Sequence, residues 1–232
     1  MERNLKILAD DTFREIAIKT EEEEILAGLM AAKKYLTCKL FYDDAGSKLF
    51  KQITRLEEYY PSRTEKSILK RHAEELMKGT EGASLVELGS GDCSKISILL
   101  QVLPRAMLKT STYVPIDVSM SAMKESRSKL RERFGAIEVC GIVADFMQQI
   151  HQVSRHKNRI FCFFGSTIGN LDRQDAVQFI AKLGKLIKTG ERLLLGLDMV
   201  KDKSALERAY NDEKGVTARF NKNILNLANK IL

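Results

Sequence analysis

Two glycines that follow a short apolar segment are the residues of this chain whose spacing most directly suggests chemistry. Residues 85–88 are apolar except for Glu87, as in a buried strand, and an amphipathic helical pattern begins at Ile96. Gly89 and Gly91 lie between them, where a backbone without side chains can turn sharply and approach a ligand closely. The amide N–H groups of the helix would point back at that ligand. The segment therefore predicts a nucleotide-binding turn between a strand and a helix.

The spacing around this turn distinguishes between two kinds of nucleotide ligand. A dinucleotide fingerprint has a third glycine five residues after the first, and this chain has Ser94 at that position. Glu87 gives the turn an acidic-x-Gly-x-Gly pattern instead, which is typical of many S-adenosylmethionine (SAM)-dependent methyltransferases. The pattern favours SAM, although a Gly-x-Gly pair alone also occurs in ordinary tight turns.

Acidic residues follow two further segments with strand-like patterns. Asp117 ends the segment 112–116, and Asp145 and Phe146 follow the segment 138–143. A carboxylate at the tip of the second strand can accept hydrogen bonds from both ribose hydroxyls. An acid beside an aromatic ring can hold an adenine amino group. Together with the glycine turn, these residues predict a SAM site along the carboxyl edge of a parallel sheet.

The elements that must position these residues alternate between strand and helix. A nearly continuous apolar run at 159–164 is typical of a central parallel strand, and a fifth strand is expected at 193–197. Helical patterns are expected at 22–36, at 46–53, from the capping box Ser62–Glu65 to about Lys78, at 172–188, and from residue 199 onward. This alternation predicts an α/β fold, Rossmann-like and of the SAM-dependent methyltransferase type, with a parallel central sheet and an N-terminal helical segment.

Composition restricts the class of protein and its compartment. A chain of 232 residues, 44% of them hydrophobic, can hold one large α/β domain or a domain with a smaller lobe. No segment approaches the ~20 apolar residues that span a bilayer, and no signal peptide is evident at the N-terminus. The four cysteines are scattered without C-x-x-C spacing, as expected of reduced thiols. We therefore expect a cytoplasmic protein with no membrane partner and no metal.

The net charge of +7 suggests a nucleic-acid partner, but the pattern of charges does not support one. Basic residues are spread along the predicted helices and interleaved with acidic residues. No concentrated basic stripe with interleaved aromatic residues occurs. Solvated helix faces explain the charge, and we expect no nucleic-acid partner.

Four motifs outside the glycine turn resemble the histidine-specific SAM-dependent methyltransferase family. They are FYDDAGSKLF at 41–50, EYYPSRTE at 58–65, FGSTIGN at 164–170 and AYNDEKGVTARFN at 209–221. The resemblance runs in register from about residue 8 to residue 232. The family's best-known member makes Nα,Nα,Nα-trimethylhistidine (hercynine) for ergothioneine biosynthesis. The resemblance therefore implies a SAM-dependent methyltransferase that acts on the α-amino group of histidine, a small-molecule partner.

The same resemblance implies roles for individual residues. Those implied to contact SAM are Gly89, Lys95, Asp117, Asp145 and Phe146, and those implied to contact the amino-acid substrate are Tyr42, Tyr59, Asn170 and Tyr210. Tyr59 and Asn170 are the candidate catalytic residues, because polar uncharged groups can orient an amine without protonating it. Taken by themselves, Tyr59 and Tyr210 could be packing residues. Lys95 could be a surface lysine, an unusual charge at a helix N-terminus unless an anion such as the SAM carboxylate lies nearby.

The resemblance also divides the chain into parts. Residues 1–60 are expected to contribute to a substrate lobe, residues 61–200 to form the SAM-binding domain, and residues 201–232 to begin the rest of the substrate lobe. Family members usually continue beyond the segment that ends at Leu232, so we expect this lobe to be incomplete here. Histidine specificity is therefore less strongly indicated than methyl transfer.

Two other functions stay open at this point. The chain could methylate another amino acid or an indole-type amine, or it could be a non-catalytic SAM-fold protein that binds a partner chain. A nucleic-acid methyltransferase is a more distant third possibility. The sequence does not indicate an oligomeric state.

Overall fold

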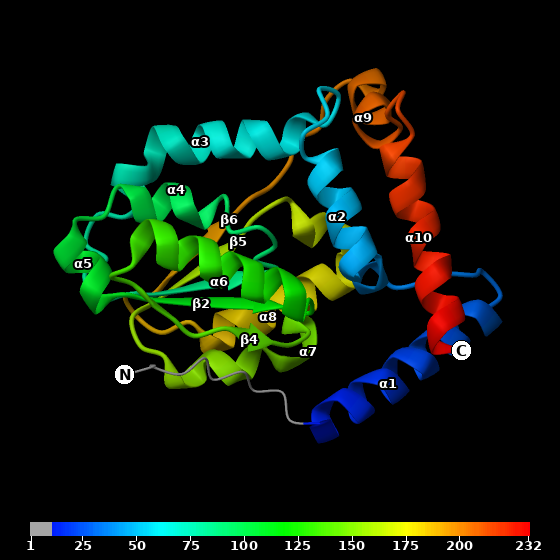
Figure 1. Ribbon diagram of the computed structural model, residues 1–232, viewed down its shortest axis with the longest axis horizontal. Coiled ribbons are helices and arrows are strands. Elements are labelled where there is room, and N and C mark those ends of the chain that lie inside the picture. The colour runs from blue at the N-terminus through cyan, green and yellow to red at the C-terminus, as the bar shows by residue number, and fades with distance from the viewer. Residues whose placement is uncertain (1–10) are drawn as a thin grey trace. The chain divides into compact units, whose positions relative to one another are not determined.

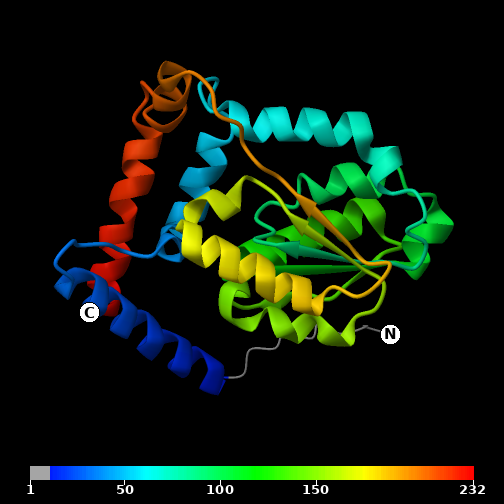
Figure 2. The ribbon, with the colours of Figure 1, turned by 180° about the vertical axis from the view of Figure 1, so that it is seen from behind.

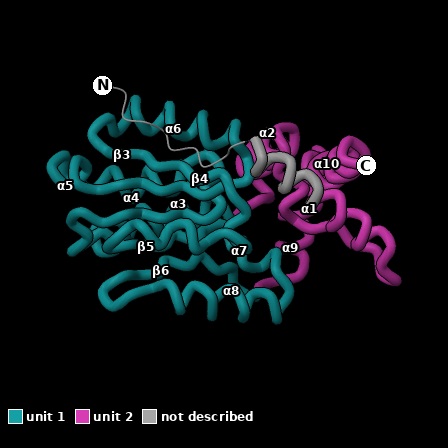
Figure 3. Tube along the Cα trace, turned by 90° about the horizontal axis from the view of Figure 1, so that it is seen from below, with its two compact units in different colours: residues 1–7, 61–200 teal, residues 8–60, 201–232 magenta. Residues whose placement is uncertain are grey.

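The structure is a computed structural model that describes the backbone from residue 11 to residue 232 and the side chains from residue 21 onward. The described chain separates into two compact units (Figure 3). Unit 1 comprises residues 61–200, and the described part of unit 2 comprises residues 11–60 and 201–232. No helix in the described part of the chain is long and apolar enough to cross a membrane.

Unit 1 contains a parallel sheet of six strands in the order β3-β2-β1-β5-β6, with β4 also paired to β2. The strands are β1 (Ser84–Leu88), β2 (Thr112–Asp117), β3 (Glu138–Val139), β4 (Ile142–Val143), β5 (Arg159–Phe163) and β6 (Arg192–Leu195). Strands β1 and β5 are buried along their whole length, because neighbouring strands flank them and helices cover both faces. The expected α/β fold with a parallel central sheet is confirmed.

The continuous third strand expected at 138–143 is wrong, because β3 and β4 are separated at Cys140 and Gly141. The reason lies in β2. The carbonyl groups of Tyr113 and Asp117 accept hydrogen bonds from the third-strand segment, so the residue between them, Pro115, faces the same neighbour. Proline has no N–H to donate, so the ladder loses one bond at this point.

Helices cover both faces of the sheet (Figures 1 and 2). One face packs against α3 (Tyr60–Leu76), α4 (Ile96–Gln101), α5 (Arg105–Thr110) and α6 (Met120–Phe134), and the other against α7 (Phe146–Gln149), η2 (Ile150–Arg155) and α8 (Arg173–Leu186). Alternate strand residues contribute to the two cores. Leu85 and Tyr113 belong to the first core, and Val86 and Val114 to the second. This alternation follows from the two-residue period of a strand.

Two expected helix starts differ from the structure. Helix α3 begins at Tyr60, so Ser62 lies inside its first turn and the expected capping box starting at Ser62 is wrong. Proline is tolerated at position 61, because the N–H groups in the first turn of a helix have no acceptor within the helix, and the missing N–H of Pro61 therefore costs no helical hydrogen bond. The N-terminal helix α1 runs from Asp11 to Met30 rather than over 22–36. It ends where Tyr35 folds back to donate its N–H to the Gly28 carbonyl oxygen.

Unit 2 is helical and is formed from both ends of the described chain. Its elements are α1 (Asp11–Met30), η1 (Cys38–Tyr42), α2 (Asp44–Ile53), α9 (Lys203–Tyr210) and α10 (Val216–Ile231). The Asp43 side chain joins the distant segments, since its Oδ1 accepts hydrogen bonds from Gly46 N and from Asn223 Nδ2, both at 2.7 Å. Helix α10 begins after Gly215, where the Asp212 carboxylate accepts hydrogen bonds from the first backbone N–H groups. The helical pattern expected after residue 198 is thus divided into two helices.

Candidate functional site

The glycine turn after β1 has the backbone conformation that only glycine adopts easily. Gly89 and Gly91 have φ values of +67° and +52°, and Gly89 N donates to the Ile116 carbonyl oxygen at 2.9 Å. A Cβ atom on Gly89 would lie 3.6 Å from Cε1 of Phe146. A larger side chain at this position would therefore press against the Phe146 ring. The turn and the ring lie next to each other at the carboxyl edge of the sheet.

Asp117 ends β2 and fastens the same turn. Its Oδ2 accepts from Gly91 N and its Oδ1 from Ser119 N, each at 2.9 Å. Burial raises the pKa of this carboxyl group, and the backbone N–H donors oppose that shift. Each carboxylate oxygen can accept more than one hydrogen bond, so these contacts leave acceptor capacity for hydroxyl groups.

Asp145 and Phe146 lie where β4 passes into α7. Asp145 is the N-cap of that helix, with Oδ1 accepting from Met147 N at 2.9 Å. The Phe146 ring packs against Phe163 and Phe179, with ring centroids 5.5 and 5.6 Å away. Aromatic packing from β5 and α8 thus holds the ring beside Gly89. The structure brings four of the five predicted SAM residues to the carboxyl ends of β1, β2 and β4, as parallel strand ends require.

Lys95, the fifth predicted SAM residue, precedes α4 and already has an anionic partner. Its Nζ lies 2.6 Å from Oε2 of Glu65 on α3. The sequence suggests an anion near Lys95, and in the structure a protein carboxylate occupies that role. Sequence reasoning missed Glu65 because it assigned that residue to the capping box.

Glu87, the acidic residue before the turn, is fully enclosed. Its Oε2 accepts a hydrogen bond from the Tyr113 hydroxyl at 2.5 Å, and its exposed fraction is 3%. Burial raises the pKa of Glu87 from 4.5 to about 8, although the hydrogen bond from Tyr113 and the charge of Lys95 oppose the shift. The folded protein therefore favours the protonated form of Glu87 well above the pH at which a free glutamate ionises. Nothing in the sequence around Tyr113 identifies it as the hydrogen-bond partner of Glu87.

The three predicted substrate tyrosines belong to unit 2 and to one aromatic cluster. The rings of Tyr59 and Tyr210 meet edge to face, with centroids 5.8 Å apart. Phe50 contacts both Tyr42 and Tyr59 in the same geometry, at 5.5 and 6.2 Å. Tyr59 is 7% exposed and Tyr210 is 53% exposed, so Tyr210 presents its ring to solvent while Tyr59 anchors the cluster. Such edge-to-face contacts fix ring orientation as well as burying area.

Asn170 belongs to unit 1 and is exposed at the end of the short helix η3 (Thr167–Asn170). The loop that leads to it is shaped by Gly165 and Ser166, which have φ values of +82° and +55°. The left-handed conformation is unusual for serine, and Ser166 Oγ accepts a hydrogen bond from Asp198 N at 3.0 Å. The sequence placed Asn170 correctly after a central strand, but it gave no sign of the strained serine.

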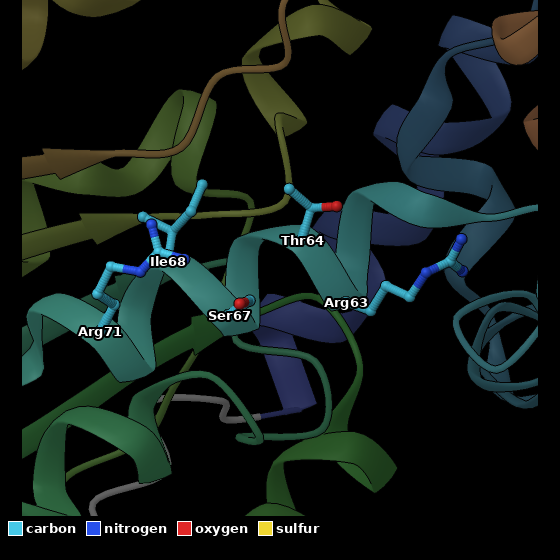
Figure 4. A pocket seen from close by; sticks show the side chains of 5 residues that line it. All are labelled: Arg63, Thr64, Ser67, Ile68 and Arg71. Carbon is cyan, nitrogen blue, oxygen red and sulfur yellow. The ribbon is translucent and has the colours of Figure 1, made fainter.

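A shallow hollow lies elsewhere on unit 1, on the exposed side of α3 (Figure 4). It is lined by Arg63, Thr64, Ser67, Ile68 and Arg71. None of the predicted site residues lines this hollow, and we assign it no role. Among the side chains described from residue 21 onward, no group of three or more His, Cys, Asp or Glu residues could hold a metal ion.

Comparison with known proteins places the chain in a family. The model of the family "Histidine-specific methyltransferase, SAM-dependent" matches residues 21–232. A histidine N-alpha-methyltransferase of Mycobacterium tuberculosis is 40% identical over 209 residues, which are 90% of this chain and 65% of that protein. A histidine N-alpha-methyltransferase of Mycolicibacterium smegmatis is 39% identical over 225 residues, 97% of this chain and 70% of that protein.

A third relative comes from a fungus. The ergothioneine biosynthesis protein 1 of Neurospora crassa is 30% identical over 225 residues, which are 94% of this chain and 25% of that protein. The chain thus spans 65–70% of the length of the two bacterial relatives and a quarter of the fungal one. The resemblance drawn from the sequence motifs is confirmed by the family match and these relatives. This chain belongs to the histidine-specific, SAM-dependent methyltransferase family.

Proposed function

We propose that the protein transfers methyl groups from SAM to the α-amino nitrogen of histidine, giving trimethylhistidine (hercynine) for an ergothioneine-type pathway. The observation that carries the proposal is the family match over residues 21–232, which includes the glycine turn and all four family motifs. Two relatives of about 40% identity bear the name histidine N-alpha-methyltransferase.

The chemistry of the side chains at the carboxyl edge of the sheet in unit 1 supports SAM as the ligand. Gly89 keeps the turn beside the Phe146 ring free of a side chain, and that ring offers an apolar surface for an adenine ring. Asp117 can accept from the ribose hydroxyls, and Asp145 can accept from the adenine amino group. Lys95 supplies a cation for the carboxylate of the amino-acid end. SAM, when bound, supplies an electrophilic methyl group on a sulfonium, and its departure leaves a neutral thioether.

The task of the protein is to orient and desolvate the attacking amine. The α-amino group of free histidine is mostly protonated near pH 7.5, because its carboxylate holds the pKa of the amine above the value of about 8 found at a peptide N-terminus, so the amine must lose a proton before it attacks. We propose that Tyr42, Tyr59, Asn170 and Tyr210 contact histidine, with Tyr59 and Asn170 orienting its amino group. The hydroxyl and amide groups of these residues can donate or accept hydrogen bonds without giving the amine a proton.

Mass spectrometry of the product tests this proposal. The purified chain is incubated with methyl-labelled SAM and, in parallel, with histidine, tryptophan, other amino acids and buffer alone. Mono-, di- and trimethylated histidine are expected, with label on the α-nitrogen and none on the imidazole. Label transferred to another amine in preference to histidine would contradict the substrate assignment. SAM binding without transfer to any amine would favour a non-catalytic SAM-binding protein.

We also propose that the protein works in the cytoplasm. No disulfide joins any of the four cysteines, and Cys93 and Cys162 are buried. Free cysteines are typical of a reducing compartment. Fractionation of the native host, with detection by an antibody to this chain, tests the location.

A further inference from the structure

The Glu65 carboxylate joins loops that follow two central strands. Its Oε2 lies 2.6 Å from Lys95 Nζ, in the loop after β1. Gly165 N, in the loop after β5, donates to the same carboxylate, with distances of 2.8 Å to Oε1 and 3.0 Å to Oε2. The side chains of Lys95 and Glu65 are 20% and 16% exposed, so solvent screens the pair only partly. Helix α3 is thereby connected to both loops through one side chain.

A glycine at the end of β6 makes room for this carboxylate. A Cβ atom on Gly196 would lie 2.0 Å from Glu65 Oε1, a distance at which one of the two must move. Outside Glu65, the nearest atom to that Cβ is Phe164 Cα at 3.4 Å, which is an ordinary contact. Gly165 contributes in the same way, because its Cβ would lie 3.0 Å from Lys95 Nζ. The backbone around the ion pair is therefore shaped to admit both charged groups.

We propose that Glu65 is a positioning residue for SAM binding: it holds the Lys95 ammonium at the carboxyl edge of the sheet, and Lys95 binds the α-carboxylate of SAM. Glu65 acts through Lys95 and touches no reacting atom. Gly196 has a matching role, since it leaves the space in which Glu65 can reach Lys95. The inference rests on the proposed function, because the role of Lys95 as a SAM ligand is part of that function.

Whether Glu65 strengthens or weakens the binding of SAM depends on two opposed contributions. An ammonium on a flexible four-carbon stem loses rotamer entropy when it is held, and in this protein the pairing with Glu65 restricts Lys95 before SAM binds. Against this, the Glu65 charge weakens the pull of Lys95 on an anion. The amino-acid end of SAM also carries an ammonium, and the attraction between this ammonium and Glu65 offsets part of the second contribution. Lys95 keeps further N–H donors for the ligand carboxylate after it pairs with Glu65.

Calorimetry with two ligands tests the proposal. SAM carries the amino-acid end, and 5′-methylthioadenosine has the same nucleoside without it. Glu65→Gln is expected to weaken SAM binding about tenfold, as for a lost charged hydrogen bond. The same variant should change 5′-methylthioadenosine binding by less than about twofold, because that ligand does not reach Lys95. Glu74→Gln, an exposed glutamate on the same helix, is the matched control and should change neither.

A double-mutant cycle separates positioning from a general structural effect. In a Lys95→Met background, Glu65→Gln should have little further effect on SAM binding, because the residue through which it acts is gone. Gly196→Ala should reproduce the SAM defect by displacing the carboxylate, and it should add little in a Glu65→Ala background. Circular dichroism confirms that each variant is folded before its affinity is compared.

The outcomes distinguish this inference from the proposed function. Three results would each overturn the positioning role. Glu65→Gln could lose the same affinity for both ligands, or it could bind SAM as tightly as wild type or more tightly. It could also lose the same SAM affinity with and without Lys95. A wild-type protein that binds SAM and methylates histidine would still satisfy the proposed function in every one of those cases. A wild-type protein that binds neither ligand would instead contradict the proposed function itself.

Discussion

Glu87 offers a direct test of the electrostatics beside the glycine turn. The carboxyl group is enclosed, and burial raises its pKa from 4.5 to about 8. Between these pH values the folded protein holds a proton that the unfolded chain has released. The stabilising contribution of this proton is complete below pH 4.5 and is lost as the pH rises towards 8. The replacement Glu87→Gln removes the titration and keeps an oxygen that can accept from the Tyr113 hydroxyl.

The size of the effect follows from the linkage between proton binding and folding. A group that is protonated in the folded state alone changes the free energy of unfolding by about 1.4 kcal/mol per pH unit. For pKa values of 4.5 and about 8, wild type should lose about 2–3 kcal/mol relative to Glu87→Gln between pH 5 and pH 7. Every other titrating group is common to both proteins, so it cancels in the comparison.

Urea unfolding at a series of pH values measures this difference. The chain contains no tryptophan, so circular dichroism is the suitable signal. Glu132→Gln, at an exposed position on α6, is the control and should leave the pH profile unchanged. Parallel profiles for wild type and Glu87→Gln would refute the reasoning, because they would mean that Glu87 has the same pKa in the folded and unfolded chains.

Other side chains give shorter tests. Asp117→Ala should weaken SAM binding by ~1.5–3 kcal/mol, as for a hydrogen bond to a charged group, and unchanged affinity in calorimetry would contradict the ribose contact. Asn170→Ala should raise the KM for histidine sharply in a steady-state assay while the Kd for SAM stays nearly constant, and a parallel loss of SAM affinity would argue against a substrate role. Glu191→Ala should destabilise unit 1 by about 3–5 kcal/mol at pH 7, because it leaves the Arg159 guanidinium, only 1% exposed, without its partner carboxylate. The Arg159 guanidinium lowers the pKa of Glu191 from 4.5 to about 2. In urea unfolding, the greater stability of wild type over Glu191→Ala should therefore decrease as the pH falls below 4.5. A difference in stability that stays constant down to pH 2 would contradict the ion pair.

The sheet could be predicted from the sequence wherever burial leaves a clear pattern. Strands β1, β2 and β5 were expected at nearly the positions where they lie, because strands buried on both faces have almost continuous apolar sequences. The interruption between β3 and β4 was missed, although its cause is visible in the sequence. Pro115 lies in β2 but interrupts the neighbouring strand, because it cannot donate a hydrogen bond to that strand. The sequence pattern of residues 138–143 by itself therefore gives no sign of the interruption.

The candidate site was predictable where a residue type and a strand end coincide. Gly89 follows β1, Asp117 ends β2 and Asp145 lies just beyond β4, so the topology brings them to one edge of the sheet. Glu65 could not be found in this way, because it lies on a helix that precedes the sheet in the sequence. The pattern Ser62–Glu65 gave it a local explanation, and the structure shows a long-range contact instead. Sequence spacing describes neighbours along a helix, whereas an ion pair between elements depends on how those elements pack.

The polar groups at the carboxyl edge of the sheet, where we propose that SAM binds, share one property that bears on catalysis. Asp117 accepts from Gly91 N, Asp145 from Met147 N, and Lys95 pairs with Glu65, so the protein itself directs these side chains before a ligand arrives. Groups that are already held lose little freedom on binding, and a methyl transfer that needs only alignment benefits from such preorganisation. Substitutions that keep the charge but release the side chain should therefore impair binding almost as much as substitutions that remove the charge. Gly196→Ala is the clearest case, because it alters no functional group and acts only by displacing the carboxylate that holds Lys95.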